Sequence, residues 1–225
     1  MTEQHVTPDV ASLVVGILGG TGEEGRGLAR RLAGAGNPII IGSRSAERAT
    51  TVAAELGAGP LIRGMLNEDA ARLADLVIVA VPWEGHRELL ASLAAPLAGK
   101  IVIDCVNPVG FDNRGCYPLR VAEGSAAEQA AAVLPASVVV GAFHHVSAIL
   151  LLDPEVTEID LDVLVLGDDR QATDLVQALA ARIPGVRGVY GGRLRNCYQV
   201  EAFTANLVSI NRRYKSHAGL RITDI

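Results

Sequence analysis

The sequence predicts an α/β protein, with a doubly wound parallel sheet followed by a smaller C-terminal domain. From residue 13 onward, short apolar runs alternate with helix-like segments, which is the rhythm of successive βα units. Of the 225 residues 49% are apolar but only 4% are aromatic, so we expect a core of Ala, Val, Leu and Ile, as buried parallel strands favour. A glycine-rich turn follows the first apolar run, where such a sheet begins.

Strands and helices are expected at regular intervals in the first part of the chain. The predicted strands are residues 13–18, 38–41, 60–65, 76–81 and 101–103, and the predicted helices are residues 23–35, 46–56, 67–74 and 84–97. Gly34 and Gly36 mark the end of the first helix and Gly57 the end of the second, because glycine accepts the backbone conformation that stops a helix. Pro82 ends the fourth strand sharply.

The remaining chain divides less regularly. Residues 107–124 form a long, Gly-rich segment that we interpret as a functional or mobile loop. Further elements are expected as a helix at 126–133, strands at 138–142 and 161–166, and amphipathic helices at 169–183 and 195–213. We therefore predict a flexible tail over residues 1–12, a nucleotide-binding domain over 13–145 and a smaller domain over 146–225.

Composition excludes several classes of function. With 20 Lys and Arg against 25 Asp and Glu, the net charge of −5 offers no electrostatic footprint for nucleic acid. The apolar runs are too short to cross a membrane, and the first dozen residues lack the apolar core of a secretory signal. Three widely spaced cysteines without a C-x-x-C pair favour a reduced, cytoplasmic setting, and no residues have metal-ligand spacing.

The turn after the first strand indicates a dinucleotide site. It reads Gly20-Thr21-Gly22-Glu23-Glu24-Gly25, the G-x-G-x-x-G pattern of a Rossmann-type fold. The three glycines permit a tight turn, close approach of a pyrophosphate and close packing of helix on strand. The helix N-terminus offers N–H groups to the phosphates, and we expect the carboxyl groups of Glu23 and Glu24 to point to solvent.

The end of the second strand indicates which dinucleotide binds. An NAD site usually has an Asp or Glu there, whereas this chain has Ser43 and Arg44, with Arg48 one helical turn further on. A hydroxyl and two guanidinium groups suit a 2′-phosphate, so we predict NADP(H). The alternative is an NAD site in which both arginines only solvate the helix start and Glu47 weakens their field.

Several segments together resemble one enzyme family. They are Leu18-Gly19-Gly20-Thr21-Gly22, Ile41-Gly42-Ser43-Arg44, Val81-Pro82-Trp83-Glu84 and Asn211-Arg212-Arg213-Tyr214-Lys215. Over about residues 13–225, the chain resembles the NADPH-dependent oxidoreductases of coenzyme F-420, which transfer hydride between NADP(H) and a 5-deazaflavin. The resemblance implies that the 146–225 domain closes the deazaflavin cleft and that the protein is a homodimer.

The resemblance also implies a role for individual residues. Thr21, Gly22, Glu23 and Glu24 would lie beside the pyrophosphate, and Ser43, Arg44 and Arg48 around the 2′-phosphate, while Val81, Pro82 and Gly85 would adjoin the adenosine or nicotinamide. Asn107, Ala148 and Ala218 would line the cofactor cleft, and His144 would be the catalytic residue where the two rings meet. A structural role for His144 is the alternative.

Other functions remain open. The first is an NADPH-dependent reductase of another acceptor, such as a flavin, a ferric complex, an imine or a keto acid. The second is an NADP(H) sensor without catalysis, or a paralogue that only transports the deazaflavin. Carbonyl reduction of the short-chain dehydrogenase kind is disfavoured, because no tyrosine has a lysine four residues on. We expect His86 on the surface, and Trp83 either over the nicotinamide or packed at a domain boundary.

Overall fold

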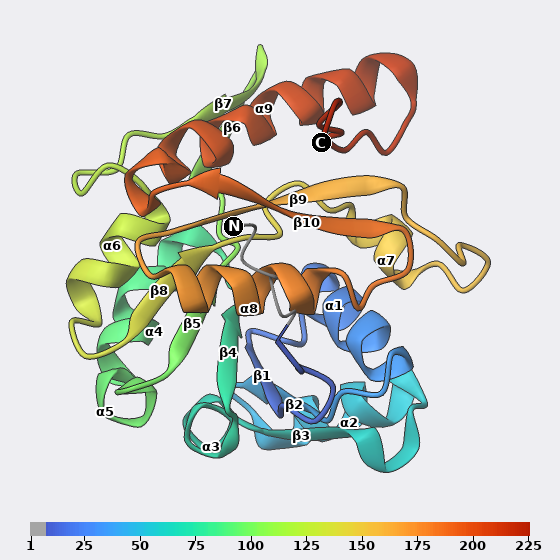
Figure 1. Cartoon of the computed structure of the whole chain (residues 1–225), viewed down its shortest axis with the longest axis vertical. Helices are drawn as coiled ribbons and strands as arrows, with labels where there is room; N and C mark the ends of the chain where they lie inside the picture. The colour runs from blue at the N-terminus through green and yellow to red at the C-terminus, as the bar shows by residue number, and fades with distance from the viewer. Residues whose placement is uncertain (1–7) are drawn as a thin grey trace, which may run out of the picture.

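The computed structural model describes residues 8–225 and places eight strands in one sheet, in the order β10-β9-β8-β5-β4-β1-β2-β3 (Figure 1). Neighbouring strands are parallel throughout one part of this sheet, which is β8-β5-β4-β1-β2-β3. This order is that of the doubly wound dinucleotide-binding fold. The predicted fold class, an α/β protein with a mostly parallel sheet, is therefore confirmed.

The parallel strands are β1 (Val15–Leu18), β2 (Ile39–Ser43), β3 (Ile62–Leu66), β4 (Leu76–Val79), β5 (Ile101–Asp104) and β8 (Val138–Gly141). The helices are α1 (Glu23–Gly34), α2 (Ala46–Leu56), α3 (Asn67–Leu73), α4 (His86–Ser92), α5 (Ala94–Leu97), α6 (Ala126–Val133), α7 (Ala148–Leu152), α8 (Arg170–Ala180) and α9 (Cys197–Tyr214). Short 3₁₀ turns lie at η1 (Gly59–Leu61), η2 (Trp83–Gly85) and η3 (Leu194–Asn196). The predicted 84–97 helix is interrupted at Leu93, between α4 and α5.

Two apolar cores lie on the two faces of the sheet. Helices α1, α2, α7 and α8 cover one face, and α3 to α6 with the start of α9 cover the other. Strand β4 shows the alternation that builds them, because Leu76 and Ile78 belong to the first core and Val77 and Val79 to the second. The central strands are buried on both faces, which explains why they are continuous apolar runs.

The last two strands extend this same sheet. Strand β9 (Leu161–Gly167) pairs antiparallel with β8, and β10 (Val186–Gly192) pairs parallel with β9. We did not predict β10 from the sequence, because Gly188, Gly191 and Gly192 interrupt its apolar pattern. The glycine at position 188 is required by packing, since a Cβ there would lie 2.5 Å from the Cα of Gln177 on α8.

The segment 107–124 is not the loop that we predicted. It contains a hairpin of β6 (Val109–Asp112) and β7 (Gly115–Pro118), which lies against α9 (Figure 1). The Asp112 carboxylate accepts hydrogen bonds from the backbone N–H groups of Arg114 and Gly115, and Gly115 has a φ of 123°. An aspartate that binds the turn and a glycine that closes it are typical of a hairpin.

The predicted flexible tail falls partly on residues 1–7, which lie outside the described residues. The end of the tail segment is anchored to the domain. Val10 is buried, and its carbonyl accepts a 2.7 Å hydrogen bond from the Asn37 side chain. Burial and hydrogen bonding of this kind oppose the loose behaviour expected of a terminus, so the ordered chain begins before Leu13.

Candidate functional site

The glycine-rich turn connects β1 to α1 at the point where the strand order of the sheet reverses. A Cβ on Gly19 would lie 2.6 Å from the Ala80 carbonyl oxygen, and a Cβ on Gly25 would lie 2.6 Å from the Gly20 Cα. Gly22 differs from both, because a Cβ there would meet no atom closer than 3.5 Å. The chain's own packing therefore does not require glycine at position 22, and the free space above it suits a bound group.

A cavity of about 720 Å³ lies over this turn, between the carboxyl ends of β1, β2 and β4. Its lining includes eight of the predicted site residues, which are Thr21, Gly22, Ser43, Arg44, Arg48, Val81, Pro82 and Gly85. Gly20, Glu23, Glu24 and Gly25 belong to the adjoining turn and first turn of α1. Strand order and local sequence thus bring together residues from three separate segments.

Two guanidinium groups at the cavity lack partners. Arg44 and Arg48 are exposed, and in the part of the chain that the structure describes neither side chain forms an ion pair or hydrogen bond. Other exposed arginines, such as Arg72 and Arg87, bind carboxylates. Two free cations at the rim of a cavity favour an anionic ligand.

The Ser43 hydroxyl is positioned by the start of α2. It accepts a 3.2 Å hydrogen bond from the backbone N–H of Ser45, and Ser45 in turn caps α2 by accepting from the backbone N–H of Arg48. The Ser43 hydroxyl proton is left available for a ligand. These caps fix Ser43 and Arg48 at the same end of the cavity.

Sequence reasoning missed Asn67, which also lines the cavity. It is the first residue of α3, is only 8% exposed, and its Oδ1 accepts a 3.4 Å hydrogen bond from the Gly19 backbone N–H. The contact spans 48 residues of sequence, so no local pattern reveals it. Asn67 supports the turn from the neighbouring helix.

A second group of predicted residues lies further along the same sheet edge. Asn107 follows β5, His144 follows β8, and the Asn107 amide donates a 3.0 Å hydrogen bond to the His144 carbonyl. Asn107 Oδ1 and both His144 ring nitrogens are buried without a hydrogen-bond partner among residues 8–225. Unpaired buried polar atoms are costly, and a bound ligand with polar edges would satisfy them.

The two histidines after β8 are neutral. Burial, together with the neighbouring His145, lowers the pKa of His144 to about 3. Burial also lowers the pKa of His145, whose Nε2 lies 2.6 Å from the Val200 carbonyl oxygen on α9. A neutral imidazole offers one donor and one acceptor, so His144 can hydrogen-bond a ligand but holds no charge at neutral pH.

The expectation that the Glu24 carboxyl points to solvent is wrong. Its Oε1 is buried and has no hydrogen-bond partner in the described part of the chain, and burial raises the pKa of Glu24 to about 8. Glu23, one residue earlier, is exposed as expected. Neighbouring residues on a helix point about 100° apart, so one carboxyl enters the protein while the other stays in water.

The expected surface position of His86 is also wrong. His86 is fully buried, and its Nε2 lies 2.6 Å from Asp104 Oδ2. The centroids of the His86 and Trp83 rings are 5.6 Å apart. Ala148 begins α7, while Ala218 lies in the tail after α9, where its N–H donates to Asn211. Neither alanine lines the 720 Å³ cavity, and the structure does not bring them into the group around Arg44.

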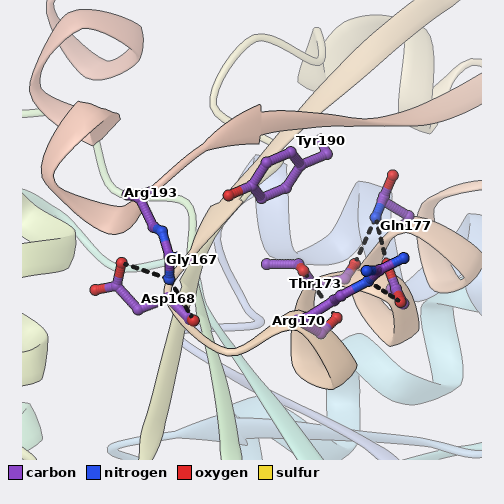
Figure 2. Close-up of a pocket in the computed structure, with 8 residues that line it drawn as sticks. Gly167, Asp168, Arg170, Thr173, Gln177, Tyr190 and Arg193 are labelled. Atoms are coloured by element: carbon purple, nitrogen blue, oxygen red, sulfur yellow. Dashed lines mark hydrogen bonds and ion pairs between the residues drawn. The ribbon is translucent and has the colours of Figure 1, made fainter.

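A smaller hollow of about 380 Å³ lies between the start of α8 and strand β10 (Figure 2). Figure 2 shows the Tyr190 ring above Thr173, with Gln177 to one side. Arg193 lies 3.8 Å from the Asp168 carboxylate, and Arg170 lies 3.8 Å from that of Asp174. Since these arginines already have carboxylate partners, the charge here is balanced, unlike that around Arg44.

Two further properties concern residues 8–225 as a whole. Among them no group of three or more His, Cys, Asp or Glu side chains is arranged to hold a metal ion. Nor is any helix in this range long and apolar enough to span a bilayer.

Comparison with known proteins agrees with this geometry. Residues 14–108 match a family model described as "NADP oxidoreductase coenzyme F420-dependent". The F420-dependent NADP reductase of Methanothermobacter thermautotrophicus is 37% identical over 96% of this chain and 97% of its own length. That of Methanocaldococcus jannaschii is 39% identical, over 94% of this chain and 98% of its own.

A solved structure supports the same assignment. The crystal structure of a protein described as an F420-dependent NADP reductase from Arthrobacter sp. FB24 superposes with a TM-score of 0.82 and is 25% identical in sequence. The match covers 95% of this chain and all of that one. Likeness to the methanogen enzymes over nearly the whole of both chains shows the family, and the protein belongs to the F420-dependent NADP reductases.

Proposed function

We propose that this protein transfers hydride between NADP(H) and the 5-deazaflavin coenzyme F-420. One structural observation carries the proposal most strongly: a single cavity joins the free space over Gly22 to the guanidinium groups of Arg44 and Arg48, which have no partner among the described residues. Relatives that match over nearly their full length belong to the same family. When both cofactors are bound they supply the redox chemistry themselves. The protein's part is to hold them in line and keep water out.

The dinucleotide would be held at its two charged groups, the pyrophosphate and the 2′-phosphate. The α1 N-terminus and the open space above Gly22 suit the pyrophosphate, because the first N–H groups of a helix have no partners within it. Ser43, Arg44 and Arg48 suit a 2′-phosphate, since a hydroxyl donor and two free cations converge there. The free arginines favour NADP(H) over NAD(H).

The deazaflavin would lie toward Asn107 and His144. Their unpaired buried polar atoms are further along the edge of the sheet from the turn, where the two rings could meet. Helix α9 stands over this edge (Figure 1), and its Val200 carbonyl contacts His145, which supports the proposal that residues 146–225 close the cleft. His144 is the residue we assign to contact the reacting rings, as a neutral hydrogen-bonding group.

An anaerobic spectroscopic assay tests the reaction. Purified protein is mixed with NADPH and oxidised coenzyme F-420, and bleaching of the deazaflavin absorption is followed, with NADH in place of NADPH and FMN in place of F-420 as controls. We expect bleaching with NADPH and F-420 together, and much less in either control. Saturable NADPH binding without bleaching would indicate another acceptor or a sensor.

We also propose a homodimer formed through α9. This helix carries large apolar or aromatic side chains that remain exposed in the single chain, namely Tyr198, Phe203, Ile210 and Tyr214. Exposed apolar groups gathered on one helix favour a protein interface. Sedimentation equilibrium should give a dimer mass, and Phe203→Ser should shift the equilibrium toward monomer. A monomer at all workable concentrations of the unaltered protein contradicts the dimer.

A cytoplasmic location is consistent with the thiols. Cys105, Cys116 and Cys197 are all free, and two of them are buried. Free cysteines persist most readily in a reducing compartment. Fractionation of the source cells, with activity as the marker, tests this proposal.

A further inference from the structure

The Glu24 side chain is unusual for a pyrophosphate-binding turn. It is the second residue of α1, and its Oε1 is buried with no hydrogen-bond partner among the described residues. Nothing about this position in the fold requires an acid, since the backbone N–H groups of the turn do the binding. The carboxyl therefore needs an explanation beyond solvation of the helix start.

No cation within residues 8–225 compensates this carboxyl. The nearest basic residue on α1 is Arg26, which binds Glu55 of α2 at 3.1 Å. Helix α7 and strands β1 and β2, which also pack on α1, carry no charged side chain. From α2, Arg48 lies at the cavity rim, and the remaining charged residues are Glu47 and Glu55.

The Cys105 thiol, at the edge of the sheet, does not donate a hydrogen bond to Glu24 either. Cys105 feels the charge of Glu24, but its thiol donates its proton to the Val79 carbonyl at 2.9 Å. Asp104, one residue earlier, is itself an acid. An ionised carboxylate with a buried oxygen and no cation or donor among the described residues is disfavoured, so burial raises the pKa of Glu24 to about 8.

We propose that Glu24 holds a proton beside the glycine-rich turn and that NADP(H) binds the protein only in this protonated form. This inference rests on the proposed function, because it takes NADP(H) to be the ligand of the turn. A pyrophosphate at the α1 N-terminus brings two negative charges close to residue 24. An ionised carboxylate there would repel it in a poorly solvated site, whereas the acid form is neutral and can donate its O–H.

The proposal makes binding above neutral pH consume a proton. With Glu24 ionised, complex formation adds one H⁺ to its carboxylate as the dinucleotide enters, so charge and atoms balance. Below the pKa of Glu24 the proton is already present and binding is independent of pH. Above it, the apparent affinity falls about tenfold for each pH unit.

The experiment measures the dissociation constant of NADP⁺ by calorimetric titration between about pH 7 and about pH 9.5, where a 2′-phosphate is already fully ionised. The unaltered protein should bind with constant affinity to about pH 8 and more weakly above it. Glu24→Gln imitates the neutral acid and should remove the fall. Glu23→Gln removes the neighbouring exposed carboxyl, and whatever it does to affinity at pH 7, the fall above pH 8 should remain.

Proton uptake gives a second readout that needs no variant. At about pH 9, titrations in two buffers of different ionisation enthalpy should report uptake of nearly one proton per NADP⁺ bound. A flat profile in the unaltered protein, no proton uptake, or a fall that persists in folded Glu24→Gln would overturn the proposal. Absence of NADP⁺ binding at every pH, in every variant, would instead overturn the assignment of the cofactor.

Discussion

The Nε2 atom of His86 lies 2.6 Å from the Oδ2 atom of Asp104, and neither side chain is exposed to solvent. The other ring nitrogen faces Gln129 Oε1 at 3.1 Å, and the Gln129 amide donates to Glu123, which fixes its orientation. An acceptor oxygen at each ring nitrogen stabilises the doubly protonated, cationic form of His86, whose pKa is raised. Asp104 ends β5, so this buried ion pair holds the strand from which the segment of Asn107 departs.

Removing the charge of Asp104 should destabilise the protein strongly. Asp104→Asn leaves His86 buried without its counter-ion, and breaking a buried pair in this way typically costs about 3–5 kcal/mol. Urea unfolding at about pH 6 measures the loss. Asp69→Asn removes a carboxylate from an exposed pair with Arg72 and should cost less than about 1 kcal/mol. Equal losses in the two variants would contradict a structural role for the buried pair.

The same pair predicts how stability depends on pH. Burial lowers the pKa of His86, but hydrogen bonding and the charge of Asp104 outweigh it, so the pKa is raised above its ordinary value. A raised pKa in the folded state means that the contribution of His86 is complete below the unfolded pKa, about 6.5, and is lost as pH rises through the folded value. The free energy of unfolding should therefore fall above about pH 6.5.

Buried acids such as Glu201 also make the free energy of unfolding fall as pH rises, so the test of His86 needs a matched control. Burial raises the pKa of Glu201 to about 7, so its contribution also declines as pH rises from the unfolded value toward 7. Asp104→Asn removes the carboxylate that contributes most to the raised pKa of His86. The slope above about pH 6.5 should therefore be smaller in this variant than in the unaltered protein. An identical slope would mean that His86 does not titrate between the two states.

Arg44→Ala should weaken NADPH binding far more than NADH binding. The Arg44 guanidinium has no partner among the residues that the structure describes, so its removal leaves none of their carboxylates unpaired and the loss reports the ligand contact. A charge-assisted hydrogen bond contributes about 1.5–3 kcal/mol, which corresponds to roughly a 10- to 150-fold change in affinity. Fluorescence titration with both dinucleotides measures it, and Arg114→Ala on the distant hairpin is the control. Equal effects on both dinucleotides would refute the 2′-phosphate site.

Two glycines of the turn should separate binding from folding. Gly22→Val projects into the cavity, and its φ of −78° is available to any residue, so we expect loss of NADPH binding with little change in the unfolding midpoint. Gly25→Ala places a Cβ 2.6 Å from the Gly20 Cα, so it should lower stability by distorting the turn. Thermal unfolding and NADPH titration of both variants distinguish the cases. Normal binding by Gly22→Val would mean that the pyrophosphate lies elsewhere.

The sheet and the cofactor turn could be predicted because their determinants are local. Strands β1, β4, β5 and β8 are runs of Val, Ile and Leu, since both of their faces are buried. The turn is recognisable because close packing leaves no room for a Cβ at Gly20 or Gly25, while the space above Gly22 is free. Strand β10 escaped notice because its glycines satisfy packing against α8, and this requirement leaves no apolar alternation.

Burial of single polar residues could not be predicted. The sequence indicates a surface position for His86 because it follows exposed residues at the start of a helix. Its partner Asp104 lies at the end of β5, which is separate in sequence and comes close only in the fold. Glu24 likewise looks solvated, since its neighbour Glu23 is. In both residues the environment depends on segments that lie far away in the sequence. Such contacts, rather than the turn, distinguish this chain within the general fold.

His144 should matter for the deazaflavin and not for the dinucleotide. Both of its ring nitrogens are buried and unpaired, and its pKa of about 3 keeps it neutral over the working range of pH. His144→Ala removes a donor and an acceptor from the place proposed for the ring contact. We expect single-turnover reduction of F-420 by NADPH to slow by about tenfold or more, roughly 1.4 kcal/mol, with NADPH affinity unchanged. His144→Gln keeps one donor and one acceptor and should restore part of the rate. Because the imidazole does not titrate near neutrality, the rate should show no inflection from His144 around pH 6.5. A loss of NADPH affinity that matches the loss of rate would place His144 in the dinucleotide site, and an unchanged rate would leave it a packing residue.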